Sequence, residues 1–140
     1  MAQVLVVANR TAESEDLLEA LKARAAQGGV RFTLLVPASG HGIQRAANTH
    51  AGEAEGEDHL DRAVERLRKE GLEVEAQLGD SDPVAAVSDA ANAEKFDEVI
   101  VSTLPTHLSK WLHLDLPRKV AHMTGLPVEH VLTKEKDPAR

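Results

Sequence analysis

Residues 72–103 read LEVEAQLGDSDPVAAVSDAANAEKFDEVIVST, and this stretch decides the fold class. Its first seven residues alternate between apolar and polar side chains, which predicts a half-exposed edge strand from Leu72 to Leu78. Asp82 and Pro83 then form an N-cap and first-turn pair, and an apolar helical stripe follows. The short run from Val99 to Val101 predicts a buried strand. The stretch is therefore a β-α-β unit, the building block of a parallel sheet.

The same alternation continues on both sides of this unit. Three further short runs, rich in Val and Leu, predict buried strands at Val4–Ala8, Phe32–Val36 and Val128–Leu132. Amphipathic helical stripes lie between the strands, at Leu17–Ala25, Leu60–Leu67 and Leu116–Met123. A helix thus follows each of the first four strands, and a fifth strand ends the series. The pattern predicts an α/β fold with a five-stranded parallel sheet and helices on both of its faces.

The 140 residues suit one domain, which we expect to span residues 1–133. Residues 37–56 carry Gly, Ala, Ser, Asn and His without periodicity, which predicts a long surface loop. Residues 134–140 form a charged tail that contains a proline. Neither segment has the apolar pattern of a core element.

Composition excludes several classes of function. The formal net charge is −7 and aromatic residues make up only 2% of the chain. Such a surface repels duplex DNA and anionic membranes, and it offers few rings for stacking on bases. The chain has no cysteine, which excludes thiolate metal sites and thiol catalysis. The first residues lack the basic stretch of a secretory signal, so we expect a cytoplasmic protein without nucleic-acid or membrane partners.

Polar residues follow the first and fourth predicted strands. Ligands of open α/β sheets bind beyond the carboxyl ends of the strands, where the strand order reverses. The candidate ligand-binding residues are therefore Asn9, Arg10, Thr11, Ser102, Thr103, Thr106, His107 and Ser109. Such a cluster suits a small polar or phosphorylated ligand. An alternative role for the same hydroxyls is to cap turns and helices.

Catalytic and metal-binding motifs are missing from these loops. The chain has no Walker A sequence, no G-x-G-x-x-G and no G-x-S-x-G. Its seven histidines form no His-x3-His pair of the kind that holds a metal on a helix. We therefore expect no catalytic residues and no metal.

The ordered set of motifs resembles the universal stress protein family. The likeness rests on QVLVVANRT near the start, GDSDPVAAVSDAANAEKFDEVIVST in the middle and PVEHVL near the end. The resemblance implies a three-layer, Rossmann-like fold of the adenine nucleotide alpha hydrolase type, with strand order 3-2-1-4-5. It also implies ATP or AMP as a ligand and a homodimer.

The chain departs from the nucleotide-binding members of that family at two places. Asn9 stands where those members usually carry an Asp, and residues 102–120 contain no glycine where those members have a glycine-rich phosphate loop. Glycines in such loops let backbone amides approach phosphate closely. The first hypothesis is therefore a non-catalytic, ligand-sensing or stress-response module. The alternative is a nucleotide-binding universal stress protein with at most slow hydrolysis.

A receiver domain of a response regulator is a third hypothesis, similar in length and element order. Receivers need an acidic pair after the first strand to hold magnesium, and Asn9-Arg10 does not provide one. An enzyme on the same scaffold ranks last.

The last strand, Pro127–Leu132, is expected to be a sheet edge with apolar side chains. An uncovered apolar edge favours pairing with a second chain. A two-fold axis would join two copies in antiparallel fashion and close the assembly. The rival arrangement is a monomer in which the tail folds back over this edge.

Overall fold

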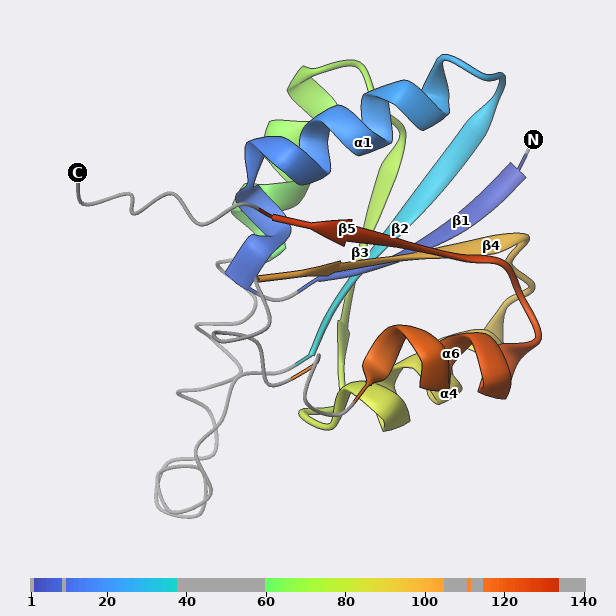
Figure 1. The fold of residues 1–140 in the computed structure, drawn as a ribbon. Coiled ribbons are helices and arrows are strands. Elements are labelled where there is room, and N and C mark those ends of the chain that lie inside the picture. Colours follow the sequence, from blue (N-terminus) through green and yellow to red (C-terminus); the bar gives the residue numbers. More distant parts are fainter. Residues whose placement is uncertain (1, 9, 38–59, 105–110, 112–114, 134–140) are drawn as a thin grey trace, which may run out of the picture.

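The computed structural model describes residues 2–8, 10–37, 60–104, 111 and 115–133. Five strands form one fully parallel sheet in the order β3-β2-β1-β4-β5 (Figure 1). The strands are β1 (Ala2–Val7), β2 (Val30–Pro37), β3 (Val74–Gly79), β4 (Glu98–Thr103) and β5 (Val128–Leu132). The predicted fold class and strand order are confirmed. The loop 37–56, beyond Pro37, and the tail 134–140 lie outside the described residues.

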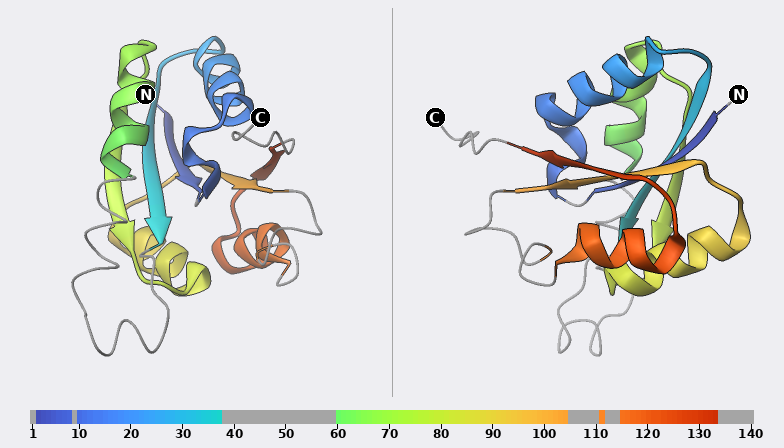
Figure 2. Two further views of the ribbon diagram at one scale, coloured as in Figure 1. Left: turned by 90° about the vertical axis from the view of Figure 1, so that its left-hand side faces the viewer. Right: turned by 45° about the vertical axis from the view of Figure 1, so that its right-hand side comes forward.

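Helices cover both faces of the sheet (Figure 2). One face carries α1 (Glu15–Ala25) and a helix over residues 60–69, and the other carries α4 (Pro83–Ala93) and α6 (Leu116–Thr124). A short 3-10 helix, η1 (Arg10–Glu13), joins β1 to α1. Each face has its own apolar core, and the central strand β1 contributes alternate residues to the two. The described chain is thus a three-layer sandwich.

The central strands are buried because both of their faces are covered. Val4 and Val6 of β1 lie in the core under α1, whereas Leu5 and Val7 lie in the core under α4 and α6. All four side chains are fully buried. This explains why β1 reads as a continuous apolar run in the sequence, without the alternation of a half-exposed strand.

Local signals set the limits of α4 and α6. Asp82 accepts a hydrogen bond from the backbone N–H of Val84, and Pro83 occupies the first turn, as predicted. Gly125 closes α6 in the left-handed conformation, with φ of 72°. A side chain there would strain the backbone, so glycine suits the position.

The start of β3 differs from the prediction. The alternating pattern predicts a strand that starts at Leu72, but β3 begins at Val74. Leu72 is buried, and its backbone N–H is bonded to the carbonyl of Leu67 at the end of the preceding helix. That turn uses Leu72 to close the helix, so the residue cannot also join the ladder.

Candidate functional site

The carboxyl ends of β1 and β4 lie side by side at the centre of the sheet. β4 ends at Ser102 and Thr103, and η1 begins three positions after the end of β1. The strand order reverses between these two strands, because β2 follows β1 on one side and β4 lies on the other. In open α/β sheets this switch point is where ligands bind.

Hydroxyl groups join η1 to the end of β4 directly. The Oγ1 of Thr11 lies 2.7 Å from the Oγ of Ser102 and 3.3 Å from the backbone carbonyl oxygen of Ser102. Both residues are almost fully buried. The sequence therefore predicts their proximity correctly, but their hydroxyls bond each other beneath the surface. This contact fixes η1 against β4, a structural role that differs from the capping of turns and helices considered as the alternative for these side chains.

Thr103 lies on the opposite face of the sheet from Ser102, because neighbouring strand residues point to opposite sides. Its Oγ1 lies 2.6 Å from the Nε2 of His130 in β5. Burial lowers the pKa of His130 below its ordinary value, because a partly desolvated imidazole is less easily charged. The neutral ring can accept a hydrogen bond from Thr103, and the protonated ring can donate one.

A further hydroxyl pair, which the sequence analysis did not single out, lies beside β5. The Oγ of Ser14 accepts a hydrogen bond from the backbone N–H of Leu17 and so caps α1. The same Oγ lies 3.1 Å from the Oγ1 of Thr133, whose backbone N–H donates to the carbonyl of Thr103. Thr133 follows the last strand directly. This position after a strand could have identified Thr133 as a site candidate from the sequence, because the carboxyl ends of all parallel strands lie at the same edge of the sheet.

Arginines of the helix over residues 60–69 hold η1 and the start of α1. Arg66 donates to the backbone carbonyl of Glu13 and pairs with the carboxylate of Glu15. Arg62 lies 3.9 Å from the carboxylate of Glu13. These contacts complement the acidic first turn of α1, where carboxylates are also favoured by the helix dipole. They keep the segment after β1 in a fixed position beside β4.

Several candidate residues cannot be placed in the site. Arg10 is the first residue of η1, three positions after β1 ends at Val7, but its side chain lies outside the described part of the structure. Asn9, Thr106, His107 and Ser109 lie outside the described residues. Within the residues that the structure describes, no group of three His, Asp or Glu side chains is arranged to hold a metal ion. None of the helices described is both long and apolar enough to cross a membrane.

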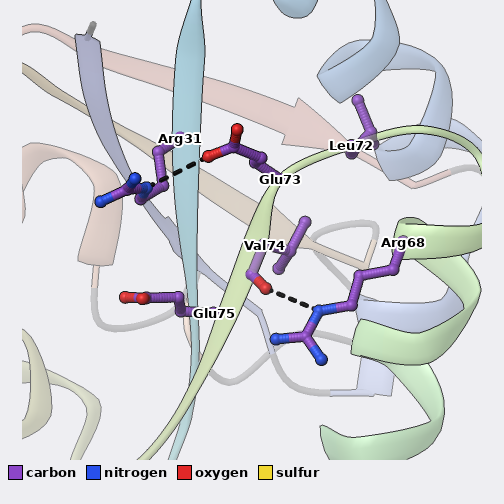
Figure 3. Close-up of a pocket in the computed structure, with 6 residues that line it drawn as sticks. All are labelled: Arg31, Arg68, Leu72, Glu73, Val74 and Glu75. Carbon is purple, nitrogen blue, oxygen red and sulfur yellow. Dashed lines mark hydrogen bonds and ion pairs between the residues drawn. The ribbon is translucent and has the colours of Figure 1, made fainter.

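A separate hollow of about 410 Å³ lies at the β3 edge of the sheet. Figure 3 shows Arg31 reaching Glu73 on one side of β3 and Arg68 reaching the backbone of Val74 on the other. The ion pair measures 3.2 Å, and the Arg68 Nε donates to the Val74 carbonyl at 2.9 Å. Both arginines are thus committed to neighbouring groups. The hollow lies away from the switch point, and most of the side chains that line it are charged.

Comparison with solved structures gives close matches in fold. A universal stress protein from Archaeoglobus fulgidus in complex with dAMP is 21% identical, with 94% of this chain and 97% of that chain covered and a TM-score of 0.64. A universal stress family protein from Arabidopsis thaliana with AMP bound is 14% identical, with 99% of each chain covered and a TM-score of 0.67. The hypothetical protein MJ0577 is 17% identical, with 96% and 98% covered and a TM-score of 0.74.

No family model matches the sequence, and no curated protein does. At these levels of identity the structural likeness concerns the fold alone. The described strands follow the order that the resemblance implies, and the matches extend over nearly the whole length of each chain. The chain has the fold of the universal stress proteins.

Proposed function

We propose that the protein is a non-catalytic, small-ligand-binding module of the universal stress type, and that it acts as a homodimer. The ligand would lie beyond the carboxyl ends of β1 and β4. The observation that carries this proposal is the hydrogen-bonded pair of Thr11 and Ser102. The pair fixes η1 against the end of β4 at the switch point. The two segments that would contact the ligand are therefore held in fixed positions.

Hydrogen bonding in the described part of the site favours binding over catalysis. A serine or threonine nucleophile needs a neighbouring base to remove its proton. The hydroxyls of Thr11 and Ser102 are buried and bonded to each other. Thr103 does contact an imidazole, that of His130, but it is itself only 2% exposed. A substrate could not reach such a hydroxyl without displacing the core around it.

Nucleotide binding is the second candidate function. It is favoured by solved structures of the same fold that are described with dAMP or AMP bound. The glycine-free stretch 102–120 weighs against it, because a Cβ on each residue restricts how closely backbone amides can approach a phosphate. Pro105 also lacks an N–H donor. We therefore rank nucleotide binding below binding of another small polar ligand.

Titration with Mg-ATP and with AMP tests these two candidates. Backbone amide shifts in a ¹⁵N-labelled sample report both the affinity and the location of binding. We expect no dissociation constant below about 100 μM for either nucleotide, equivalent to about −5.5 kcal/mol. A low-micromolar constant would establish the second candidate in place of the first.

The same spectra test the placement of the site. Any shifts at high nucleotide concentration should gather at Thr11, Ser102 and Thr103, and Arg10→Ala should reduce them. Arg31→Ala is the matched control, since Arg31 lies at the distant β3 edge. Shifts that gather around Arg31 and Glu73 would contradict the placement. Native mass spectrometry of the freshly purified protein would identify any metabolite that it retains.

The homodimer would form through β5, which is one of the two outer strands of the sheet. Leu132 of this strand is 50% exposed, the highest value among the large apolar side chains described. Met123 of the adjacent α6 is 40% exposed. An edge strand with exposed apolar side chains is a template for another strand, and a two-fold axis limits the pairing to two copies.

A further inference from the structure

The free edge of β5 exposes the backbone groups of alternate residues. The Val99 N–H donates to the Pro127 carbonyl, and the Thr133 N–H donates to the Thr103 carbonyl. Residues 127 and 133 therefore direct their polar backbone groups toward β4, and so do the odd-numbered residues between them. The N–H and C=O groups of Val128, His130 and Leu132 point the other way, toward the partner strand of the proposed homodimer.

Two-fold axes centred on Glu129, Val131 or His130 bring these outward groups together in an antiparallel pair of at least three strand residues from each copy. Centring the axis on Glu129 places two carboxylates directly opposite each other, which destabilises a pair of strands. Centring it on Val131 pairs only three residues of the strand. Centring it on His130 pairs all five residues, Val128–Leu132, and sets Val128 of each copy opposite the partner's Leu132. The third register makes the most hydrogen bonds and buries the exposed leucine.

In that register the two His130 residues face each other across the axis. Directly opposed residues of a hydrogen-bonded antiparallel pair have Cα atoms about 5.5 Å apart and side chains on the same face. Thr103 already holds each ring from the β4 side, at 2.6 Å from Nε2. Neutral rings can pack in this arrangement. Two imidazolium ions cannot do so without like-charge repulsion in a partly desolvated seam.

We infer that protonation of His130 opens the homodimer, so that the subunits separate as the pH falls below about 6.5. The inference rests on the proposed β5 homodimer and adds a regulatory device to it. Burial already lowers the pKa of His130 in the single chain, and pairing removes further water from the ring. At pH values above the ordinary histidine pKa of about 6.5 both rings are neutral and pairing is unopposed. Because the pKa of His130 is lowered, the cost of removing its proton on pairing grows as the pH falls below that value.

The charges around His130 in the described residues do not offset its protonation. α6 packs on the same face as His130, and its titratable side chains are Arg118, Lys119 and His122, all exposed. Arg118 is 3.7 Å from Asp115, which precedes the helix. On that face β4 presents Val101 and Thr103, which carry no charge. The carboxylate of Glu129 and the charged side chains of α1 lie beyond the opposite face of the sheet.

Overall charge predicts the opposite response, which makes the effect diagnostic. The chain carries a net charge of −7 at pH 7, and its pI is about 5.5. Mutual repulsion between two copies therefore weakens as the pH falls, which favours association. Dissociation over the same interval requires a specific group that gains charge inside the seam.

Sedimentation equilibrium at pH 8.0 and pH 6.0, at constant salt, tests the inference. We expect the dimer dissociation constant of the wild type to rise by about three- to fifteenfold at pH 6.0, because two histidines must each give up a proton to pair. His130→Gln should keep the contact with Thr103 and remove the pH dependence. His122→Gln, on exposed α6, is the matched control and should respond like the wild type.

The possible results separate the homodimer from its pH dependence. A wild type that is monomeric at pH 8.0 overturns the proposed homodimer and the inference with it. A dimer with the same constant at both pH values, or a His130→Gln variant that keeps the wild-type response, overturns the inference alone. Proton NMR of the His130 ring gives a second measurement on the unaltered protein. Its pKa should fall as protein concentration rises, and a constant value would contradict the inference.

Discussion

The two outer strands of the sheet, β3 and β5, differ in how their unpaired backbone groups are covered. Each leaves backbone groups without a neighbouring strand. At β3, Arg68 bonds the outward carbonyl of Val74, and Glu73 and Glu75 place charge along the strand. At β5, the exposed side chains of the described strand include Leu132, and no such arginine contact is found there among the described residues. Charge and capping protect an edge from association, so the difference supports the proposal that β5 is the edge for a partner.

The largest expected effect separates the two edges. Leu132→Lys places a charge on the half-exposed apolar position of β5, and we expect it to abolish the homodimer while the single chain stays folded. Ala76→Lys is the matched change on β3, where Ala76 is exposed, and it should leave the oligomeric state unchanged. Sedimentation velocity at micromolar concentration distinguishes dimer from monomer, and circular dichroism confirms folding. If the Ala76→Lys variant is a monomer and the Leu132→Lys variant remains a dimer, the roles of the two edges are reversed.

A smaller effect concerns how β3 is held to the body of the protein. A Cβ at Gly79 would lie 2.7 Å from the Cβ of Ala86 in α4 and 2.8 Å from the Cδ1 of Leu35. Gly79→Ala should therefore lower the free energy of unfolding by about 1–3 kcal/mol through overpacking. Urea denaturation measures the change.

The double variant Gly79→Ala/Ala86→Gly sharpens this test. Removing the Ala86 methyl group relieves the main contact, although glycine in a helix costs about 1 kcal/mol by itself. We expect a favourable coupling of at least about 0.5 kcal/mol between the two changes. Strictly additive effects would mean that β3 and α4 adjust without strain.

The smallest effect concerns the cap on β3. Arg68→Met keeps much of the apolar stem of the side chain but removes the hydrogen bond to the Val74 carbonyl. The carbonyl can accept a hydrogen bond from water instead, so the free energy of unfolding should fall by only about 0.5–1.5 kcal/mol. The unblocked edge should also associate more readily at high concentration, seen as a rising apparent mass in light scattering. Unchanged mass across the concentration range would show that the charges of Glu73 and Glu75 protect the edge without Arg68.

Sequence patterns predict the elements well because each has a local cause. The apolar run Val99–Val101 and the pair Asp82-Pro83 give β4 and the start of α4 from a few neighbouring residues. The meeting of Thr11 with Ser102 is also predictable, since the strand order brings both loops to one place. The start of β3 is predicted two residues too early because Leu72 serves the preceding turn.

The finer chemistry of the site depends on contacts between distant parts of the chain. Ser14 and Thr133 are separated by 119 positions, and no local pattern links their hydroxyls. The contact of Thr103 with His130 follows only from the register of β4 with β5 and from the ring's orientation. Sequence reasoning lists Thr103 as a residue for the ligand. In the structure its hydroxyl is bonded to a side chain of the outer strand.

The central position of β1 also sets an order of events during synthesis. β1 pairs with β2 on one side and with β4 on the other, so Val4 is opposite Phe32 and also opposite Glu98. The nascent chain can form β1, α1 and β2 once residue 37 has emerged, but the other side of β1 stays open until about 60 further residues have been made. At 5–20 residues per second that interval lasts roughly 3–12 s. Throughout it, the apolar strand Ala2–Val7 has one unpaired side, and a chaperone that binds extended apolar segments would find its target there.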